Sequence, residues 1–317
     1  MSIIASYSKN LLQLIALCAN LLFGEVAFAA VTVVDDSGAT VRLAQPAQRI
    51  VSLAPHAAEL VFAAGAGKRL VAVAAYSDWP PQVRTLPNIG GYHSLDIERI
   101  VALKPDLVIG WASGNSTAQI SHLKRLGIPV FLSEPARFED IATNLERIGL
   151  LTDSTDSANR AAQAFRARIE ALRNRYAYQA PVKVFYQIWP EPIMILNREH
   201  ILNEVLKLCG GDNVFGNLSS LVSTITEEAV LKAAPEAILA PSEYSIKDNG
   251  LARWQRWKTL PAVAQGNLFP VNGDLLNRSG PRIAEGAEAV CQLLEQARAK
   301  RRTPAQAALR IPPRLRE

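Results

Sequence analysis

The chain has 317 residues, of which 49% are hydrophobic and 20% are charged. This is the length of about two domains and the composition of a globular protein, which excludes a disordered or fibrous chain. The formal net charge is +5, but from Ala297 onward seven basic residues stand against Glu317 alone, which places +6 there and leaves −1 on the rest. The body of the protein therefore lacks the basic surplus of a nucleic-acid-binding surface.

The two ends of the chain differ in composition from the rest. Residues 1–29 have the pattern of a cleaved secretory signal: Lys9 precedes the apolar run 11–23, and residues 27–29 are the small-residue site that a signal peptidase recognises. An uncleaved anchor is the alternative, although the run is shorter than the roughly 20 residues of a spanning helix. Residues 301–317 are rich in Arg, Pro and Ala, which predicts a disordered extension, either solvated or in contact with anionic lipid headgroups.

Residues 30–152 are expected to form one α/β lobe. A hairpin over residues 31–43 comes first, with an Asp-Ser-Gly turn. Short apolar strands then alternate with helices, and because the joining loops are short, this pattern is typical of a parallel sheet covered on both faces. The expected strands are 50–53, 70–74, 107–111 and 130–132, and the expected helices are 57–64, 96–103, 116–126 and 138–151.

A long amphipathic helix is expected from Ser154 to Tyr178, within a connecting segment 153–180. Apolar residues recur every three or four positions from Ala158 to Tyr176, which makes one stripe along a 3.6-residue period. Pro181 prevents the helix from continuing. A helix of this length spans roughly 37 Å, so it could hold two lobes at a fixed distance. The alternative is an ordinary surface helix of one larger domain.

Residues 181–300 are expected to form a second lobe, with strands 182–188 and 237–240 and helices 201–208 and 226–233. The segment EAVLKAAPEAIL from Glu228 aligns without gaps to ERIVALKPDLVI from Glu98, 130 residues earlier. A duplicated lobe is the economical explanation. The predicted fold is therefore α/β, with two Rossmann-like lobes containing parallel sheets, one rigid helix joining them, and a ligand cleft between the lobes.

The loops after the predicted strands carry most of the candidate binding residues. Ligands of open α/β sheets bind beyond the carboxyl ends of the strands, so these loops should face the cleft. Aromatic faces with a few polar anchors suit a large, flat, partly apolar ligand, although the same side chains could instead pack the lobe interface. The candidates are His56, Tyr76, Trp79, Tyr92, His93, Trp111, Trp189, Asp274 and Arg278.

Signals for catalysis are weak. The sequence contains no GxSxG, HExxH or CxxC motif. His56, His93 and His200 fall in predicted loops and could meet as metal ligands, so a secreted metal-dependent enzyme is the alternative from another class of protein. We expect no enzymatic activity, no catalytic cofactor and no metal site.

Two pairs of residues have further implications. Glu98 and Glu228 lie in the first turns of equivalent helices, where the helix dipole favours a carboxylate, and the duplication makes them a spaced pair that could dock a basic partner. Without the signal peptide the chain keeps Cys209 and Cys291, an even number that in an exported protein predicts a disulfide. Two buried thiols are the alternative.

Five segments resemble the periplasmic cobalamin-binding proteins of ABC importers, and the resemblance covers about residues 41–299. Two of the segments are typical of the whole helical-backbone class of substrate-binding proteins, which also serves siderophores and haem, and the other three of its cobalamin branch. The class segments are RIVSLAP from Arg49 and DIERIVALKPDLVI from Asp96; the branch segments are YSDWPP from Tyr76, CGGDNVF from Cys209 and RSGPRI from Arg278.

The resemblance implies a monomeric periplasmic protein that captures a corrinoid and delivers it to the membrane subunits of an ABC importer. It implies that Glu98 and Glu228 dock on those subunits and that Cys209 and Cys291 form the family disulfide. Met194, Val222, Leu275 and Leu276 stand where aromatic residues are expected, which leaves haem or a ferric siderophore as the alternative ligand. The implied ligand contacts are Tyr76, Tyr92, Trp111, Asp274, Leu275, Leu276, Asn277 and Arg278.

Overall fold

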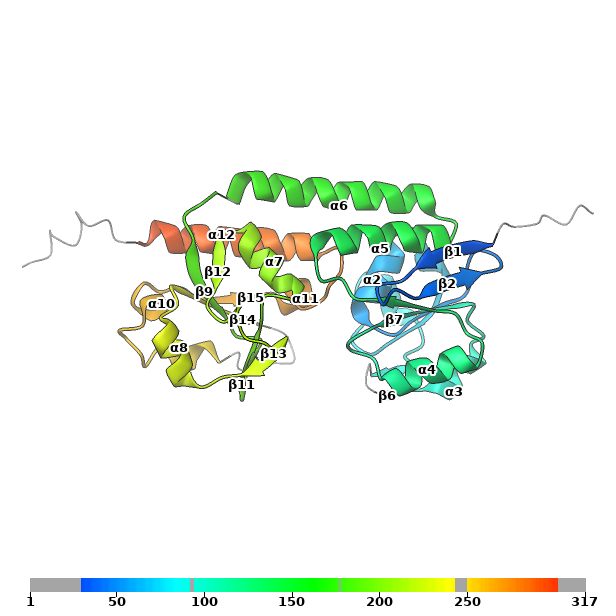
Figure 1. Ribbon diagram of the computed structural model, residues 1–317, viewed down its shortest axis with the longest axis horizontal. Coiled ribbons are helices and arrows are strands. Elements are labelled where there is room, and N and C mark those ends of the chain that lie inside the picture. The colour runs from blue at the N-terminus through cyan, green and yellow to red at the C-terminus, as the bar shows by residue number, and fades with distance from the viewer. Residues whose placement is uncertain (1–29, 92–93, 177, 243–249, 302–317) are drawn as a thin grey trace, which may run out of the picture.

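Two α/β lobes lie side by side beneath one long helix, α6 (Thr155–Tyr176), in the computed structural model (Figure 1). The structure describes residues 30–91, 94–176, 178–242 and 250–301. The predicted signal peptide and the tail after Arg301 lie outside the described residues. The arrangement confirms the predicted fold class, whereas the exact domain boundaries stay a prediction. Among the described residues, no helix is long and apolar enough to cross a membrane.

The first lobe is built on a four-stranded parallel sheet in the order β4-β3-β7-β8. Helices α2 and α5 pack on the face toward α6, and α3 and α4 cover the other face. A hairpin of β1 and β2 precedes the sheet, as predicted. The elements are β1 (Val31–Val34), β2 (Thr40–Leu43), β3 (Ile50–Ser52), α2 (Pro55–Ala63), β4 (Leu70–Val73), β5 (Gly90–Gly91), β6 (Ser94–Leu95), α3 (Ile97–Ala102), β7 (Leu107–Trp111), α4 (Thr117–Arg125), β8 (Val130–Ser133) and α5 (Phe138–Leu151), with 3₁₀ turns at Gly67–Arg69 and Pro81–Thr85.

One helix start in this lobe was predicted wrongly. Helix α2 begins at Pro55, so His56 lies in its first turn and is not in a loop. Proline is well suited to the first helical position because its missing N–H has no partner there and its φ is already helical. The other predicted strands and helices of this lobe are confirmed, with ends that shift by a residue or two.

The second lobe repeats the topology of the first. Its parallel sheet has the order β12-β9-β14-β15, so in both lobes the strands lie in the order second, first, third, fourth along the chain. Equivalent helices α3 and α8 are capped alike: the side chain of Asp96 accepts from the Arg99 N–H at 2.9 Å, and that of Thr226 accepts from the Ala229 N–H at 3.3 Å. The shared order supports the duplication inferred from the sequence.

Several elements of the second lobe were not predicted. They are strand β12, an antiparallel sheet of β10, β11 and β13, three short helices, and the long helix α12. The elements of the lobe are β9 (Val182–Tyr186), β10 (Trp189–Pro190), β11 (Ile193–Leu196), α7 (Ile201–Leu208), β12 (Gly211–Asn213), β13 (Val222–Thr224), α8 (Glu227–Ala233), β14 (Ala237–Pro241), α9 (Leu251–Trp254), α10 (Pro261–Ala264), β15 (Leu268–Val271), α11 (Gly273–Leu276) and α12 (Ile283–Ala299).

Helix α6 is fixed to both lobes along its length. Its 22 residues span about 33 Å, and its buried stripe joins an apolar layer that continues from α5 of the first lobe to α12 of the second. Arg166 pairs with Glu139 and Glu146 of α5, while Arg168 pairs with Glu288 of α12 at 2.8 Å. Bending α6 would expose this layer to water, so it acts as a rigid connector and not as a surface helix of one domain. The buried stripe consists of Ala158, Ala162, Phe165, Ile169, Leu172 and Tyr176.

The two cysteines of the second lobe form a disulfide, as predicted. Cys209 ends α7 and Cys291 lies in α12, with their Cα atoms 4.6 Å apart. Both residues are completely buried. The bond therefore ties α7 to α12, the last helix among the described residues.

Candidate functional site

Aromatic side chains follow the carboxyl ends of strands in both lobes. Tyr76 lies just after β4, Trp111 ends β7, and Trp189 lies in β10, shortly after β9. Trp189 is 46% exposed and pairs in register with Met194 of β11. Val222 in β13 of the same small sheet is 43% exposed. The second lobe thus offers one exposed indole and smaller apolar side chains beside it.

Tyr76 presents its ring to solvent. The side chain is 74% exposed, and its backbone has a φ of +65°. This left-handed conformation is uncommon for any residue with a Cβ and often marks a functional position. The ring of Tyr76 is therefore accessible to another molecule.

Trp111 is held in place by polar contacts from the neighbouring loops. Its backbone N–H donates to Asn115 at 2.7 Å and its indole N–H to Glu134 at 3.4 Å. A Cβ at Gly114 would lie 1.9 Å from the indole ring, so only glycine lets the loop backbone pass so close. His56 packs edge-on against the indole, with ring centroids 5.7 Å apart. Trp111 is therefore a fixed, half-buried wall of the first lobe.

An ion pair joins the Tyr76 loop to the second lobe. Arg278, just after α11, contacts Asp78 at 2.5 Å and Asp274 at 2.7 Å. Burial raises the pKa of the Asp78 carboxyl, but the hydrogen bond and charge of Arg278 outweigh this effect and bring the pKa below its usual value. Asp78 is therefore ionised at neutral pH. The contact places the YSDWPP loop directly against the Asp274–Arg278 segment.

Within that second-lobe segment the predicted ligand contacts differ in exposure. Asp274, Leu275 and Asn277 are partly exposed, and Asn277 accepts a hydrogen bond from the Tyr186 hydroxyl at 2.9 Å. Leu276 is only 1% exposed and lies in the core, where it packs on Gly286. In this structure Leu276 therefore offers almost no surface to a ligand, because the helical turn points it inward while its neighbours are partly exposed. Tyr92 lies outside the described residues.

The histidines of the described chain do not gather around a metal position. Burial lowers the pKa of His56 to about 4 and that of His200 to about 4, so both imidazoles are neutral at pH 7. His56 belongs to α2 of the first lobe, whereas His200 caps α7 of the second, where its Nδ1 accepts from the Leu202 N–H at 3.1 Å. Over residues 30–91, 94–176, 178–242 and 250–301, no His, Cys, Asp or Glu cluster could hold a metal ion. His93 lies outside these ranges.

Glu98 and Glu228 occupy the first turns of α3 and α8, and both are exposed. In Figure 1 these two helices lie along the edge of the molecule farthest from α6, one in each lobe. Hydrogen bonds from the Thr226 hydroxyl and from the backbone of Glu228 lower the pKa of the Glu228 carboxyl. The structure thus places one exposed carboxylate of this pair on the same side of each lobe.

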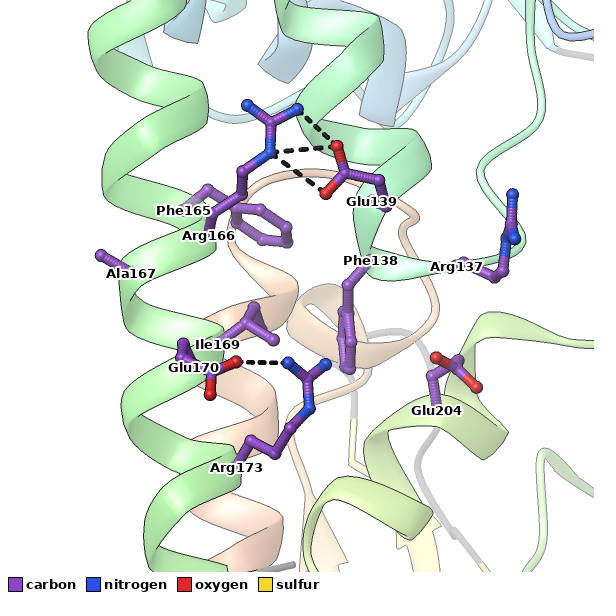
Figure 2. Close-up of a pocket in the computed structure, with 10 residues that line it drawn as sticks. All are labelled: Arg137, Phe138, Glu139, Phe165, Arg166, Ala167, Ile169, Glu170, Arg173 and Glu204. Atoms are coloured by element: carbon purple, nitrogen blue, oxygen red, sulfur yellow. Dashed lines mark hydrogen bonds and ion pairs between the residues drawn. The ribbon is translucent and has the colours of Figure 1, made fainter.

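A pocket of about 500 Å³ opens on the opposite side, among α5, α6 and α7 (Figure 2). Phe138, Phe165 and Ile169 form its apolar floor. Four of the charged side chains around it form two ion pairs, Arg166 with Glu139 and Arg173 with Glu170. None of the residues predicted to bind a ligand lines this pocket, so we do not place the ligand site there.

The sequence of the chain matches the model of a known family over most of its length. The matching region is residues 50–274, and the family is described as periplasmic binding protein. The chain belongs to this family.

Relatives of this periplasmic binding protein include vitamin B12-binding proteins. One from Vibrio parahaemolyticus is 36% identical over 258 residues, which cover 81% of this chain and 93% of that protein. The structure of the periplasmic vitamin B12 binding protein BtuF of Vibrio cholerae matches with a TM-score of 0.75 at 38% identity, over 80% of this chain and 98% of that one. The haem-binding protein RhuT from Roseiflexus matches with a TM-score of 0.71 at 22% identity, over 79% and 98%; this likeness shows the fold alone.

The charged residues at the lobe junction were not predicted from the sequence. Three of them are Glu59, Asp78 and Arg282. Glu59 and Asp78 both pair with Arg278, and Arg282, four residues after Arg278, pairs with Glu59. One signal was available: Glu59 is the only charged residue in α2, whose sequence is PHAAELVFA. A lone carboxylate in an apolar helix predicts a buried charge with a specific partner.

Proposed function

We propose that this periplasmic binding protein captures a corrinoid, the ligand class of vitamin B12, between its lobes and delivers it to an ABC importer. The observation that carries the proposal is the contact across the lobe junction between Asp78 of the Tyr76 loop and Arg278. Both segments belong to motifs that resemble the cobalamin branch of the family. Vitamin B12-binding relatives at 36% and 38% identity support the same ligand class.

In the proposed site the two lobes contribute different chemistry. Tyr76 and Trp111 offer aromatic surface from the first lobe, and Tyr92 is retained as a proposed contact. Asp274 and Arg278 offer charged groups from the second lobe that can bind the amide side chains of a corrin. Leu275 and Asn277 complete the proposed set.

The protein makes and breaks no bond in this proposal, and it needs no catalytic cofactor. Its role is to bind a ligand after export through the predicted cleaved signal and to present it, as a monomer, to the membrane subunits of the importer. The duplicated lobes and the rigid α6 suit this role because they keep two binding surfaces at a set separation.

Titration of the purified protein with cyanocobalamin, cobinamide, haemin and a ferric siderophore tests the ligand class. We expect saturable one-to-one binding of a corrinoid. Changes in the absorption spectrum of the corrinoid measure this binding. Met194 and Val222 offer less stacking surface to a corrin ring than aromatic residues would. The titration therefore includes the two iron compounds, haemin and the ferric siderophore, as alternative ligands. Binding of haemin or the ferric chelate alone would overturn the corrinoid proposal.

Tyr76→Ala should raise the dissociation constant for cyanocobalamin about 5- to 30-fold, which corresponds to ~1–2 kcal/mol for a ring packed on a desolvated ligand. The matched control is Tyr178→Ala. Tyr178 is 95% exposed but lies just past the end of α6, so its removal should leave affinity unchanged. Equal affinities for the wild type and Tyr76→Ala would remove Tyr76 from the site.

The double variant Glu98→Ala with Glu228→Ala should bind cyanocobalamin like the wild type but bind its importer at least tenfold more weakly. Each lobe would lose the carboxylate that pairs with a basic group of the membrane subunits. Glu170→Ala, on the exposed face of α6, is the control and should leave importer binding intact. If the double variant lost ligand affinity instead, the two carboxylates would belong to the ligand site.

A further inference from the structure

A buried carboxylate of the first lobe is bound by two arginines of the second. Glu59, in the middle of α2, is 4% exposed. Its Oε2 accepts from Nε of Arg282 at 3.0 Å and its Oε1 from Nη2 of the same side chain at 2.7 Å. Nη1 of Arg278 lies 3.5 Å from Oε1. Arg282 immediately precedes α12, so the pair joins a central helix of one lobe to the last helix of the other.

The geometry of the Glu59–Arg282 pair fixes the position of the two side chains relative to each other, in addition to neutralising their charges. Two parallel hydrogen bonds between a planar guanidinium and a planar carboxylate allow little freedom in distance or orientation. A buried carboxylate left without its partner is strongly destabilised. The lobes therefore cannot separate or slide at this point without leaving a charge unpaired.

The surroundings support a close and specific approach. The Arg282 guanidinium lies over the Trp79 ring, 4.8 Å from its centroid, and Trp79 belongs to the same loop as Tyr76. A Cβ at Gly280 would lie 3.1 Å from Oε2 of Glu59, so glycine lets the segment between Arg278 and Arg282 come this near. The contact thus links both segments of the proposed ligand site to one fixed point.

Helix α6 packs on both lobes, but it lies on one side of the molecule (Figure 1). Its contacts therefore constrain the lobe junction on that side only. A direct contact between the lobes adds a second constraint. The Glu59–Arg282 pair lies between α2 and the start of α12, in the lobe junction itself.

We propose that Glu59 is a positioning residue: its pair with Arg282 is the pivot that sets the separation of the lobes and keeps the Tyr76 loop opposite Arg278. The prediction for ligand affinity rests on the proposed function, whereas the prediction for lobe separation does not. Glu59 itself touches no ligand in this proposal. It acts through the arginines that it holds.

The test compares Glu59→Gln, which removes the charge but keeps the shape, with Arg282→Lys, which keeps the charge but not the paired hydrogen bonds. Spin labels at Arg125→Cys in α4 and Lys232→Cys in α8, both exposed, report the distance between the lobes without ligand. We expect a narrow distribution in the wild-type background and a broader one in both variants. We also expect cyanocobalamin to bind at least tenfold more weakly, mainly through faster dissociation.

Glu288→Gln is the matched control, because it breaks the pair of Glu288 with Arg168, whose side chains are both 44% exposed, and solvent-exposed pairs contribute little. It should change neither readout. An unchanged distance distribution in folded Glu59→Gln and Arg282→Lys would overturn the pivot. A broader distribution with unchanged affinity would overturn the positioning role. If the wild type bound no corrinoid, the proposed function would fail, but the distances would still decide the pivot.

Discussion

Reduction of the Cys209–Cys291 disulfide should lower the free energy of unfolding by about 4.5 kcal/mol. The bond joins residues 82 positions apart, and in the chain-entropy model the loss comes from the freedom that a loop of this length regains in the unfolded state. Both cysteines are buried between α7 and α12, so the two sulfurs of the reduced protein must move apart to a nonbonded distance within a packed core. Urea unfolding of the oxidised and reduced protein measures the difference.

The double variant Cys209→Ala with Cys291→Ala separates the crosslink from local packing. It should be destabilised at least as much as the reduced wild type, and its unfolding should no longer respond to reductant. Ligand affinity should stay the same, because neither cysteine belongs to the proposed ligand site. Coinciding midpoints for oxidised and reduced wild type would contradict a stabilising role for the bond.

The parts of the fold that could be predicted are those with strong local periodicity. We could predict the α6 stripe from Ala158 to Tyr176 and the buried strands β7 and β14, because each has its own hydrophobic pattern in the sequence. The internal match at Glu98 and Glu228 added the duplication, which the shared strand order then supports. These features depend on residues that are close together in the sequence.

The parts that could not be predicted depend on tertiary contacts. Strands β10 and β13 have two and three residues, too few to show a pattern of their own. They are stabilised by pairing with β11, and no local sequence pattern indicates this pairing. The Glu59–Arg282 pair joins residues 223 positions apart. Leu276 was placed with its exposed neighbours because a four-residue helix, α11, is too short to show which of its faces is buried.

Lowering the pH from 7 to 5 should destabilise the protein by about 4 kcal/mol through its two buried histidines. Burial lowers the pKa of His56 to about 4 and of His200 to about 4 from the ordinary value of 6.5. Between these two values the unfolded chain binds protons that the folded chain excludes, so stability falls as the pH falls. At pH 5 each histidine lowers the free energy of unfolding by about 2 kcal/mol. Below pH 4 the full loss for each histidine is roughly 3 kcal/mol.

The contacts of both imidazoles explain why protonation is resisted. Nδ1 of His200 accepts the Leu202 N–H, which it can do only when it carries no proton. Nε2 of His56 is buried and has no hydrogen-bond partner among the described residues. His200→Asn keeps a cap for α7, and His56→Gln keeps a polar side chain in place. Each should reduce the change in unfolding free energy between pH 7 and 5 by about 2 kcal/mol, whatever its stability at pH 7. His122→Gln removes an exposed imidazole of α4 and should retain the wild-type change; the same change in all three variants would assign the acid sensitivity to other groups.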